Sequence, residues 1–294
     1  MNHRYLTLAF VLSLAALPVL AETPSAESAE KTFIWRVQNE ATTVYLLGSV
    51  HALREDSYPL PEAMEAAFDD AQRLMFEIDL DEMAAAAFQM LAAGSLDGGR
   101  TLEEVVGPKT WTEFVARIEG MGLQPGLFRT MKPWMAAVTL TAFELSNAGY
   151  LSSAGLDTYF SERAKDAGKD RMALETVEFQ VSLFAELTPE QSLAFLEYTL
   201  EDLETVVPEL DSIAGYWRAG EVAQLEQLLV EGFDEFPEIY SKMVIDRNRA
   251  WIPKIEELLS GHQNTMVVVG SLHLVGEEGL VTLLRKRGYT VTQM

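Results

Sequence analysis

The chain has 294 residues, 48% of them hydrophobic and none of them cysteine, and its 45 acidic against 22 basic residues give a formal net charge of -23. Such a surface repels nucleic acid and anionic lipid, and no basic stripe compensates for it, so nucleic-acid binding is excluded. The absence of cysteine removes disulfide bonds and thiol catalysis together, and a core of this size can supply the stability alone.

The first residues are typical of an export signal. Arg4 is followed by an apolar run at residues 6–17 and then by small or apolar residues up to Ala21. About 12 apolar residues are too few to span a bilayer, which needs about 20, and this order is typical of a secretory signal peptide. We predict a signal peptide over residues 1–21, a flexible lead-in over 22–31 and an exported protein, periplasmic or secreted, without stable membrane insertion. An uncleaved anchor is the alternative.

Residues 32–294 are predicted to form a single domain. Segments rich in β-branched and alternating apolar residues predict strands at residues 33–37, 43–47, 73–79, 171–175, 265–269 and 289–292. Apolar spacing of helical period, with proline or threonine at several starts, predicts helices at residues 61–72, 81–93, 108–120, 133–148, 156–167, 189–203, 211–219, 221–231, 243–260 and 277–286. The expected fold class is α/β (α+β): a central mixed sheet from the N- and C-terminal segments, with a helical middle of about 81–262 inserted as a lid or second lobe.

One short motif occurs twice, each time directly after a predicted strand. The two copies are Gly48-Ser49-Val50-His51 and Gly270-Ser271-Leu272-His273. Glycine after a strand permits a tight turn, and ligands of open α/β sheets bind at the carboxyl ends of the strands. Three histidines follow the predicted leader, and two of them share this motif position. We therefore predict that His51 and His273 belong to one site, with a purely structural role as the alternative for each.

Two glutamates are predicted to join the histidines. Glu77 lies near the end of the predicted strand 73–79, on the face opposite to Leu74, Phe76 and Ile78, and Glu175 ends the strand 171–175. Imidazole and carboxylate ligands suit a divalent metal ion such as Zn, Mn, Co or Fe(II), so His51, His273, Glu77 and Glu175 form a candidate metal site. A bound ion would activate water near neutral pH, with a spare glutamate as general base. Alternatively, Glu77 is a surface residue of an edge strand and Glu175 caps the next helix.

Other residues give weaker signals. Arg247 lies on a predicted helix and could hold a carboxylate or polarise a substrate carbonyl, although a surface salt bridge would also explain it. Ser49 and Ser271 lack the glycine pattern of a nucleophile elbow, and the chain has no phosphate loop or dinucleotide fingerprint. His262 is predicted to be an exposed turn residue. None of these patterns adds a second site.

The order of the motifs resembles the TraB/GumN family, which includes the Tiki metalloproteases and is distantly similar to erythromycin esterase and ChaN-like proteins. The resemblance covers essentially the whole mature chain. It rests on the two Gly-x-x-His motifs and on Phe76-Glu77-Ile78-Asp79, with further landmarks at Lys132-Pro133-Trp134, Gly155-Leu156-Asp157, Leu174-Glu175-Thr176 and Arg247-Asn248. It implies a metal-dependent hydrolase, a peptidase in the Tiki branch, with His51, Glu77 and His273 at its centre.

We therefore predict an exported metal-dependent hydrolase that acts on a peptide or small-molecule substrate, with peptide bonds as the expected target. His51 and His273 would bind the ion, Mn, Co or Zn, with Glu77 as ligand or general base. Glu175 would support the metal, and Arg247 would stabilise charge in the transition state. Two other classes stay open: a non-catalytic protein that binds iron, haem or another small ligand, and an interaction protein that sequesters a peptide in its helical lobe.

Overall fold

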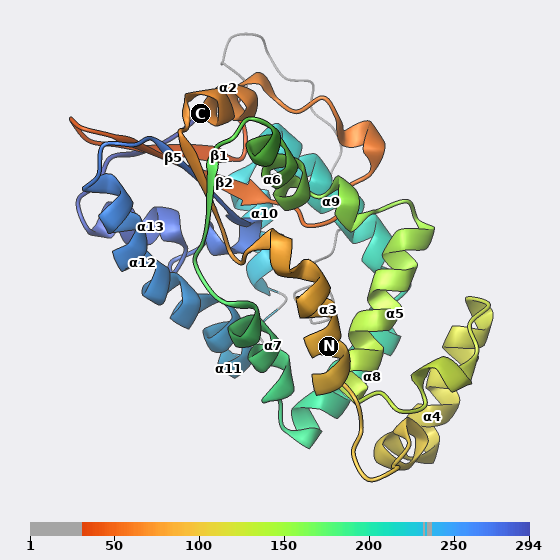
Figure 1. The fold of residues 1–294 in the computed structure, drawn as a ribbon. Helices are drawn as coiled ribbons and strands as arrows, with labels where there is room; N and C mark the ends of the chain where they lie inside the picture. Colours follow the sequence, from red (N-terminus) through yellow and green to blue (C-terminus); the bar gives the residue numbers. More distant parts are fainter. Residues whose placement is uncertain (1–30, 232, 234–236) are drawn as a thin grey trace.

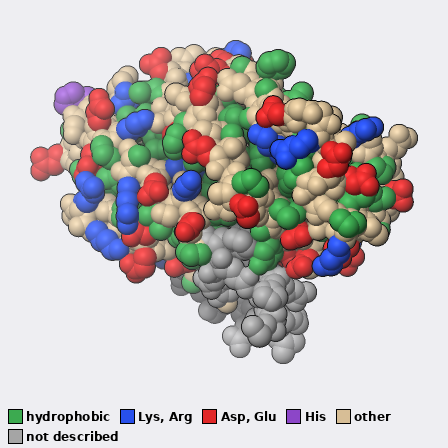
Figure 2. Space-filling view, turned by 90° about the horizontal axis from the view of Figure 1, so that it is seen from below, with side chains coloured by type: hydrophobic (Ala, Val, Ile, Leu, Met, Phe, Trp, Pro, Cys, Tyr) green, Lys and Arg blue, Asp and Glu red, His purple; other side chains and the backbone are tan. Residues whose placement is uncertain are grey.

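The computed structural model describes residues 31–231, 233 and 237–294. The predicted signal peptide (1–21) and all of the predicted lead-in except residue 31 lie outside the described residues. In the part of the chain that the structure describes, no helix is both long and apolar enough to cross a bilayer. On the face drawn in Figure 2, acidic, basic and apolar side chains of the described residues are interspersed, without a basic stripe.

Across the described residues, a mixed sheet of six strands forms the centre of the fold, in the order β4–β3–β5–β2–β1–β6 (Figure 1). The parallel part consists of β2, β3, β4 and β5, whereas β1 pairs antiparallel with both β2 and β6. The strands are β1 (Ile34–Gln38), β2 (Thr43–Ser49), β3 (Arg73–Phe76), β4 (Asp170–Ala173), β5 (Thr265–Gly270) and β6 (Val291–Gln293).

The centre of the sheet joins the two ends of the chain. β2 and β5 lie side by side with Ser49 opposite Gly270, and every residue of both strands is buried. Strands covered on both faces have near-continuous apolar sequences, which explains the runs at residues 44–47 and 266–269. The predicted fold class, α/β (α+β) with a central mixed sheet from the N- and C-terminal segments, is confirmed.

Helices surround the sheet and form a separate group beside it. The described helices are α2 (Glu62–Asp70), α3 (Met83–Ala93), α4 (Leu102–Gly120), α5 (Pro133–Asn147), α6 (Leu156–Asp166), α7 (Val177–Ala185), α8 (Pro189–Asp202), α9 (Val206–Ala219), α10 (Val222–Glu231), α11 (Pro237–Tyr240), α12 (Asp246–Leu259) and α13 (Leu280–Lys286). Figure 1 shows α4, α5 and α8 together, away from the sheet, whereas α12 and α13 lie next to it. The α4–α5–α8 group has its own apolar cluster around Trp134 and Phe195, distinct from the cluster on the sheet.

Several bounds near the sheet edge differ from the predicted ones. β4 ends at Ala173 instead of residue 175, so Glu175 lies two residues beyond the strand instead of ending it. β3 ends at Phe76 instead of residue 79, and the chain bends at residues 77–78. The Asp79 side chain then accepts a hydrogen bond from the Asp81 amide at the start of a 3₁₀ turn, Leu80–Glu82. The helix α7, for which the sequence analysis set no bounds, follows Thr176, whose hydroxyl caps it. The predicted helix 243–260 begins inside a π-helical turn, Ser241–Ile245, that leads into α12.

Candidate active site

The parallel strands bring four predicted site residues to one edge of the sheet. The carboxyl ends of β4, β3, β5 and β2 lie next to one another in this order. Glu175 follows β4 and Glu77 directly follows β3. His273 closes a 3₁₀ turn after β5, and His51 lies two residues beyond β2. Sheet topology therefore brings together residues that lie far apart in the sequence. His51 and His273 are 222 positions apart, as are Ser49 and Ser271, which are joined by a hydrogen bond.

Glu77 occupies the centre of this group. Its Oε1 atom lies 3.9 Å from Nε2 of His51 and 3.9 Å from Nε2 of His273, and it accepts a hydrogen bond of 2.8 Å from the Gly270 amide. Its Oε2 atom accepts from Arg247 Nη2 at 2.5 Å. The residue is buried, and β3 is an inner strand between β4 and β5, so the alternative of an exposed edge-strand residue is wrong.

The surroundings keep Glu77 ionised. Burial would raise the pKa of this carboxyl, but the charge of Arg247 acts against it, followed by the two histidines and the Gly270 amide. The net result is a pKa far below the usual value of 4.5. The group therefore presents a negative charge to both imidazole rings at neutral pH.

His273 is held as a neutral imidazole with a defined tautomer. The amide nitrogen of Asn248 donates to the backbone carbonyls of His273, at 3.1 Å, and Glu278, at 2.8 Å. The Asn248 Oδ1 atom must therefore accept the 2.7 Å hydrogen bond from His273 Nδ1, which leaves the lone pair on Nε2. Burial, and after it the charge of Arg247, lowers the pKa of His273 to about 3. Arg247 Nη1 donates to Nε2 at 3.0 Å.

His51 has the same ring orientation but a different environment. Its Nδ1 atom lies 2.7 Å from Oδ2 of Asp157, at the start of α6, so Nδ1 donates and Nε2 faces Glu77. The hydroxyl of Ser49 donates to the same Asp157 oxygen. Desolvation would lower the pKa of His51, but the charge and hydrogen bond of Asp157, with a contribution from Glu77, raise it to about 9. The side chain is 49% exposed and is the part of the centre open to solvent.

Arg247 is a buried cation with hydrogen-bond partners on several sides. It lies in the first turn of α12, and its Nε and Nη2 atoms donate to the carboxylate of Glu175 at 2.9 to 3.1 Å. Nη1 also donates to the Met243 carbonyl at 3.0 Å, and the guanidinium lies over the Trp251 ring. The alternative of a surface salt bridge for Arg247 is therefore wrong.

Glu175 is used to hold this arginine. Besides its bonds to Arg247, its Oε1 atom accepts from Trp251 Nε1 at 2.8 Å. The next helix is capped by Thr176, so the alternative of a helix cap at Glu175 is wrong as well. In this arrangement both carboxylate oxygens have partners, and a role for Glu175 as a metal ligand stays a prediction.

Three polar residues of the centre were not among the predicted site residues. Asp157 and Asn248 orient the two imidazoles, and Gln180 of α7 donates to Glu77 Oε2 at 3.0 Å. Asp157 and Asn248 do lie within landmarks of the family resemblance, which was the signal available for them. Gln180 belongs to a helix without predicted bounds, and no pattern pointed to it. His262 is exposed in a bend, as predicted.

The residue types at the centre are those that bind divalent cations, but the described side chains are not arranged as a metal site. Glu77, Glu175 and Asp157 contribute three carboxylates against the guanidinium of Arg247 and the protonated ring of His51, so the centre is still short of one positive charge. Each Nδ1 is tied to a partner, and each Nε2 faces Glu77, as in histidines that bind metals. However, no group of three His, Asp or Glu side chains among the described residues lies in an arrangement that could hold a metal ion. The Arg247 guanidinium lies where His273 and Glu77 would face such an ion.

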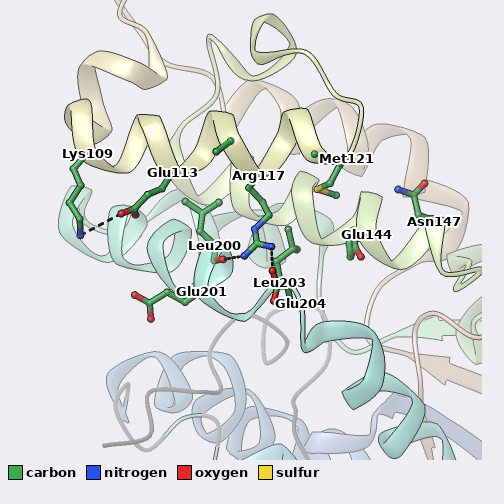
Figure 3. A pocket seen from close by; sticks show the side chains of 12 residues that line it. Lys109, Glu113, Arg117, Met121, Glu144, Asn147, Leu200, Glu201, Leu203 and Glu204 are labelled. Carbon is green, nitrogen blue, oxygen red and sulfur yellow. Dashed lines mark hydrogen bonds and ion pairs between the residues drawn. The ribbon is translucent and has the colours of Figure 1, made fainter.

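A large open cavity lies elsewhere, between α4, α5 and α8 (Figure 3). Its volume is ≈ 980 Å³, and none of the described residues that line it is a predicted site residue. Arg117 pairs there with Glu204 at 2.6 Å, and Lys109 with Glu113 at 3.8 Å. The chemistry of the side chains, and not the size of this cavity, therefore identifies the candidate site.

Comparisons with known proteins identify the family of this chain. Residues 33–293 match the model of the TraB/PrgY/gumN family. The chain is similar to the uncharacterized protein YbaP of Escherichia coli (strain K12), with 27% identity over 241 residues, 82% of this chain and 87% of that protein. It is also similar to a metalloprotease TIKI homolog of Amphimedon queenslandica, with 22% identity over 92% of this chain and 63% of the relative. Metalloprotease TIKI1 of Danio rerio is 20% identical over 93% and 65%. No solved structure gives a significant match.

Proposed function

This chain belongs to the TraB/PrgY/gumN family, and we propose that it is an exported hydrolase, periplasmic or secreted, that cleaves peptide bonds at the Glu77 centre. The observation that carries the proposal is the placement of two imidazole Nε2 atoms at 3.9 Å from the same oxygen of an ionised, buried glutamate. Two relatives are named metalloproteases, which supports a hydrolase, although their identity to this chain is only 20–22%. Export rests on the leader-like sequence of residues 1–21.

The two histidines are prepared for different tasks. Environments that push the pKa values of paired titratable groups apart mark acid and base roles, and here the values are about 9 for His51 and about 3 for His273. His51 is half-exposed and oriented by Asp157, so it can transfer a proton between water and a substrate. His273 stays neutral and buried between Asn248 and Arg247, where it holds the interior of the centre in place.

Glu77 and Arg247 set the electrostatics around the reacting atoms. A carboxylate beside the His51 imidazole favours its protonated form, which is the form that can donate to a leaving amine. A guanidinium held in a water-poor interior has a fixed direction and costs no reorganisation when charge develops nearby. Glu77 keeps its position because Gln180 donates to it, and Arg247 keeps its position because it donates to Glu175.

We also propose a divalent metal ion, Mn, Co or Zn, as cofactor. Such an ion would polarise a carbonyl and acidify a water molecule. The shortage of positive charge and the two Nε2 atoms directed at Glu77 support it, and two relatives are named as TIKI metalloproteases. His51 and Glu77 would hold the ion from the open side, where the ion would replace the Nε2 proton of His51, so that His51 would be a ligand in the metal-bound centre and a proton donor only without the ion. His273 could join them once Arg247 no longer donates to its Nε2 atom.

The test uses the mature chain, purified without chelator, with metal content measured by mass spectrometry and a peptide library incubated with Mn, Co or Zn. We expect a bound divalent ion, cleavage by the wild type, and a loss of turnover of about 10³-fold or more in His51→Ala. His262→Ala is the matched control, because His262 is an exposed histidine in a bend outside the centre, and it should behave as the wild type.

The outcomes separate the predicted classes. Full metal content and turnover in His51→Ala would contradict the proposal. A Soret band on addition of haem, without turnover of any peptide, would instead favour a ligand-binding protein. Peptide binding that survives in His51→Ala without any cleavage by the wild type would favour peptide sequestration.

A further inference from the structure

Arg247 contacts two of the groups that the proposed divalent ion would use. Its Nη2 atom donates to Glu77 Oε2 at 2.5 Å, and its Nη1 atom donates to His273 Nε2 at 3.0 Å. A neutral imidazole has one nitrogen lone pair, so His273 cannot accept from the guanidinium and bind a metal ion at the same time. The guanidinium and the ion also carry charges of the same sign and would repel each other at such a distance. Arg247 in this position and an ion bound by His273 therefore exclude each other.

Several contacts of Arg247 do not depend on Glu77 or His273. Its Nε atom donates to the two carboxylate oxygens of Glu175 at 3.1 and 3.0 Å, and Nη2 donates to the same carboxylate at 2.9 Å. The guanidinium also lies 4.8 Å from the centre of the Trp251 ring. The two Nε contacts involve neither of the nitrogen atoms that contact Glu77 and His273. Arg247 can therefore release these two residues and stay bound to Glu175.

The two residues that Arg247 would release keep other partners. Glu77 Oε1 accepts from the Gly270 amide at 2.8 Å, and its Oε2 atom accepts from Gln180 at 3.0 Å. The Nδ1 atom of His273 donates to Asn248 at 2.7 Å. Release of the arginine thus breaks two hydrogen bonds and leaves both side chains in place. The atoms that lose a donor are those that an ion would bind.

The backbone before Arg247 supplies a further acceptor. The π-helical turn Ser241–Ile245 precedes α12, and the Met243 carbonyl of this turn accepts from Nη1 of Arg247 at 3.0 Å. Turns of this kind are rare and often lie at functional sites. Because Nη1 already donates to this carbonyl, it would keep a partner after it leaves His273. The turn therefore supports a second position of the guanidinium.

From these observations we infer that Arg247 is an internal cation that regulates the proposed metal site by competing with the divalent ion for His273 and Glu77. The arrangement described above is then the ion-excluding form of the centre. In the ion-binding form, Arg247 stays on Glu175 and releases the other two residues. This inference rests on the metal ion of the proposed function, because it names the regulation of the same site. The apparent affinity for the ion is reduced by the fraction of molecules in the ion-excluding form.

The first test measures the binding of Co²⁺ alone to the purified mature chain by isothermal titration calorimetry. Arg247→Ala should bind Co²⁺ about 10-fold more tightly than the wild type, or better, since the ion no longer has to displace two charge-assisted hydrogen bonds. Arg249→Ala is the matched control, because it removes the same charge from the same helix. Arg249 is exposed and pairs with Glu278 at 3.1 Å, so the Kd of this variant should stay within about twofold of the wild type.

Free guanidinium ion gives a second readout that a general change of charge or packing would not produce. At millimolar concentration it should weaken the binding of Co²⁺ to Arg247→Ala, because it can occupy the place of the missing side chain. Tetramethylammonium at the same concentration has no N–H donor and should have no effect. Neither salt should change the Kd of the wild type, in which the side chain fills this place.

A measurement on the wild type keeps the test independent of the folding of Arg247→Ala, which circular dichroism checks. The chain is labelled with ¹⁵N and saturated with Zn²⁺, which is diamagnetic. The NMR signal of His273 Nε2 should move, because this atom exchanges its hydrogen-bond donor for the ion. The Arg247 Nε–H signal should keep its position, because its bond to Glu175 persists. Binding of Zn²⁺ that leaves the His273 Nε2 signal in place would overturn the inference.

Failure of this inference can be distinguished from failure of the proposed function. Ion-dependent peptide cleavage, with a Co²⁺ affinity in Arg247→Ala that is equal to or weaker than that of the wild type, would contradict the internal cation alone. Tighter binding in Arg247→Ala that guanidinium reverses, without cleavage of any peptide, would support the internal cation and contradict the peptidase. If neither chain binds Co²⁺, the inference is overturned, and cleavage without an ion would then retain the hydrolase.

Discussion

The two Gly-Ser-x-His elements have the same sequence pattern and the same place at the sheet edge, yet their histidines differ in nearly every physical property. The His51 side chain is 49% exposed and its pKa is raised to about 9, whereas that of His273 is 6% exposed and its pKa is lowered to about 3. The difference comes from partners on other elements: Asp157 of α6 for His51, and Asn248 and Arg247 of α12 for His273. The motif sets the position of a histidine, and its neighbours set its protonation.

The other residues of the two copies differ as well. A Cβ atom on Gly48 would collide with the Phe33 ring, whereas one on Gly270 would lie 3.0 Å from His51 Nε2. The hydroxyl of Ser49 donates to Asp157, but that of Ser271 donates to the Ser49 carbonyl at 3.0 Å. The first copy therefore uses its glycine for packing and its serine for the site, and the second copy does the reverse.

The largest expected effect comes from removing Arg247, whose guanidinium donates to His273 and to Glu77. Arg247→Ala leaves Glu77 and Glu175 buried without their counter-charge, which should lower the free energy of unfolding by about 3–5 kcal/mol, measured by urea denaturation. Arg249→Ala is the control on the same helix, because Arg249 is exposed and pairs with Glu278 at 3.1 Å, and it should cost less than about 1 kcal/mol. Equal losses would show that Arg247 does not stabilise the centre.

The glycines should respond in opposite ways. Gly48→Ala overpacks the core against Phe33 and should cost about 1–3 kcal/mol of unfolding free energy. Gly270→Ala places a methyl group 3.0 Å from His51 Nε2 and 3.4 Å from Glu77 Oε1, so we expect a smaller loss of stability and a larger loss of peptide cleavage. Thermal unfolding and turnover measured side by side check this, and parallel changes in the two variants would mean that the copies are equivalent.

The protonation difference can be measured directly by NMR titration of the imidazole signals. His51 should titrate near pH 9, and Asp157→Asn should shift its pKa downwards, because it removes the charge that favours the protonated ring. His273 should stay neutral to about pH 3 in both proteins. A single pKa shared by both rings would refute the assignment.

The same values set the sign of the pH dependence of stability. Between the ordinary pKa of 6.5 and about 9, the folded chain holds a proton on His51 that the unfolded chain releases. The contribution of His51 is thus fully present below pH 6.5 and is lost as the pH rises through about 9. For His273 the unfolded chain binds the additional proton between about pH 3 and 6.5, so stability falls as the pH decreases across that window.

The smallest expected effects concern the two serines. Ser49→Ala and Ser271→Ala each remove one hydrogen bond, part-buried for Ser49 and buried for Ser271, which should lower the unfolding free energy by about 1 kcal/mol. Only Ser49→Ala should change the NMR shift of His51 Nδ1, because only Ser49 shares the Asp157 oxygen with that ring. A shift of equal size in Ser271→Ala would mean that the second serine also acts on the site.

Much of the fold could be predicted because its signals are local. The apolar runs of β2 and β5, and the proline at the start of α5, lie within a few residues of the structure that they determine. The paired motif also predicted the meeting of His51 and His273, since parallel strands end at one edge. The limits of β3 and the π-helical turn before Arg247 were not predicted, because each depends on a particular side-chain contact or packing and not on periodicity.

The amino-acid sequence by itself determined which residue types stand at the sheet edge: two histidines, Glu77 and Glu175. Only the tertiary structure decided what each of them does there. Asp157 lies 106 positions from His51, and Arg247 lies 170 positions from Glu77, so no local pattern could connect them. Tautomer, charge and exposure depend on such distant partners, because electrostatic and hydrogen-bond energies are set by separation in space and by burial. For this reason one motif, repeated twice, yields two different histidines.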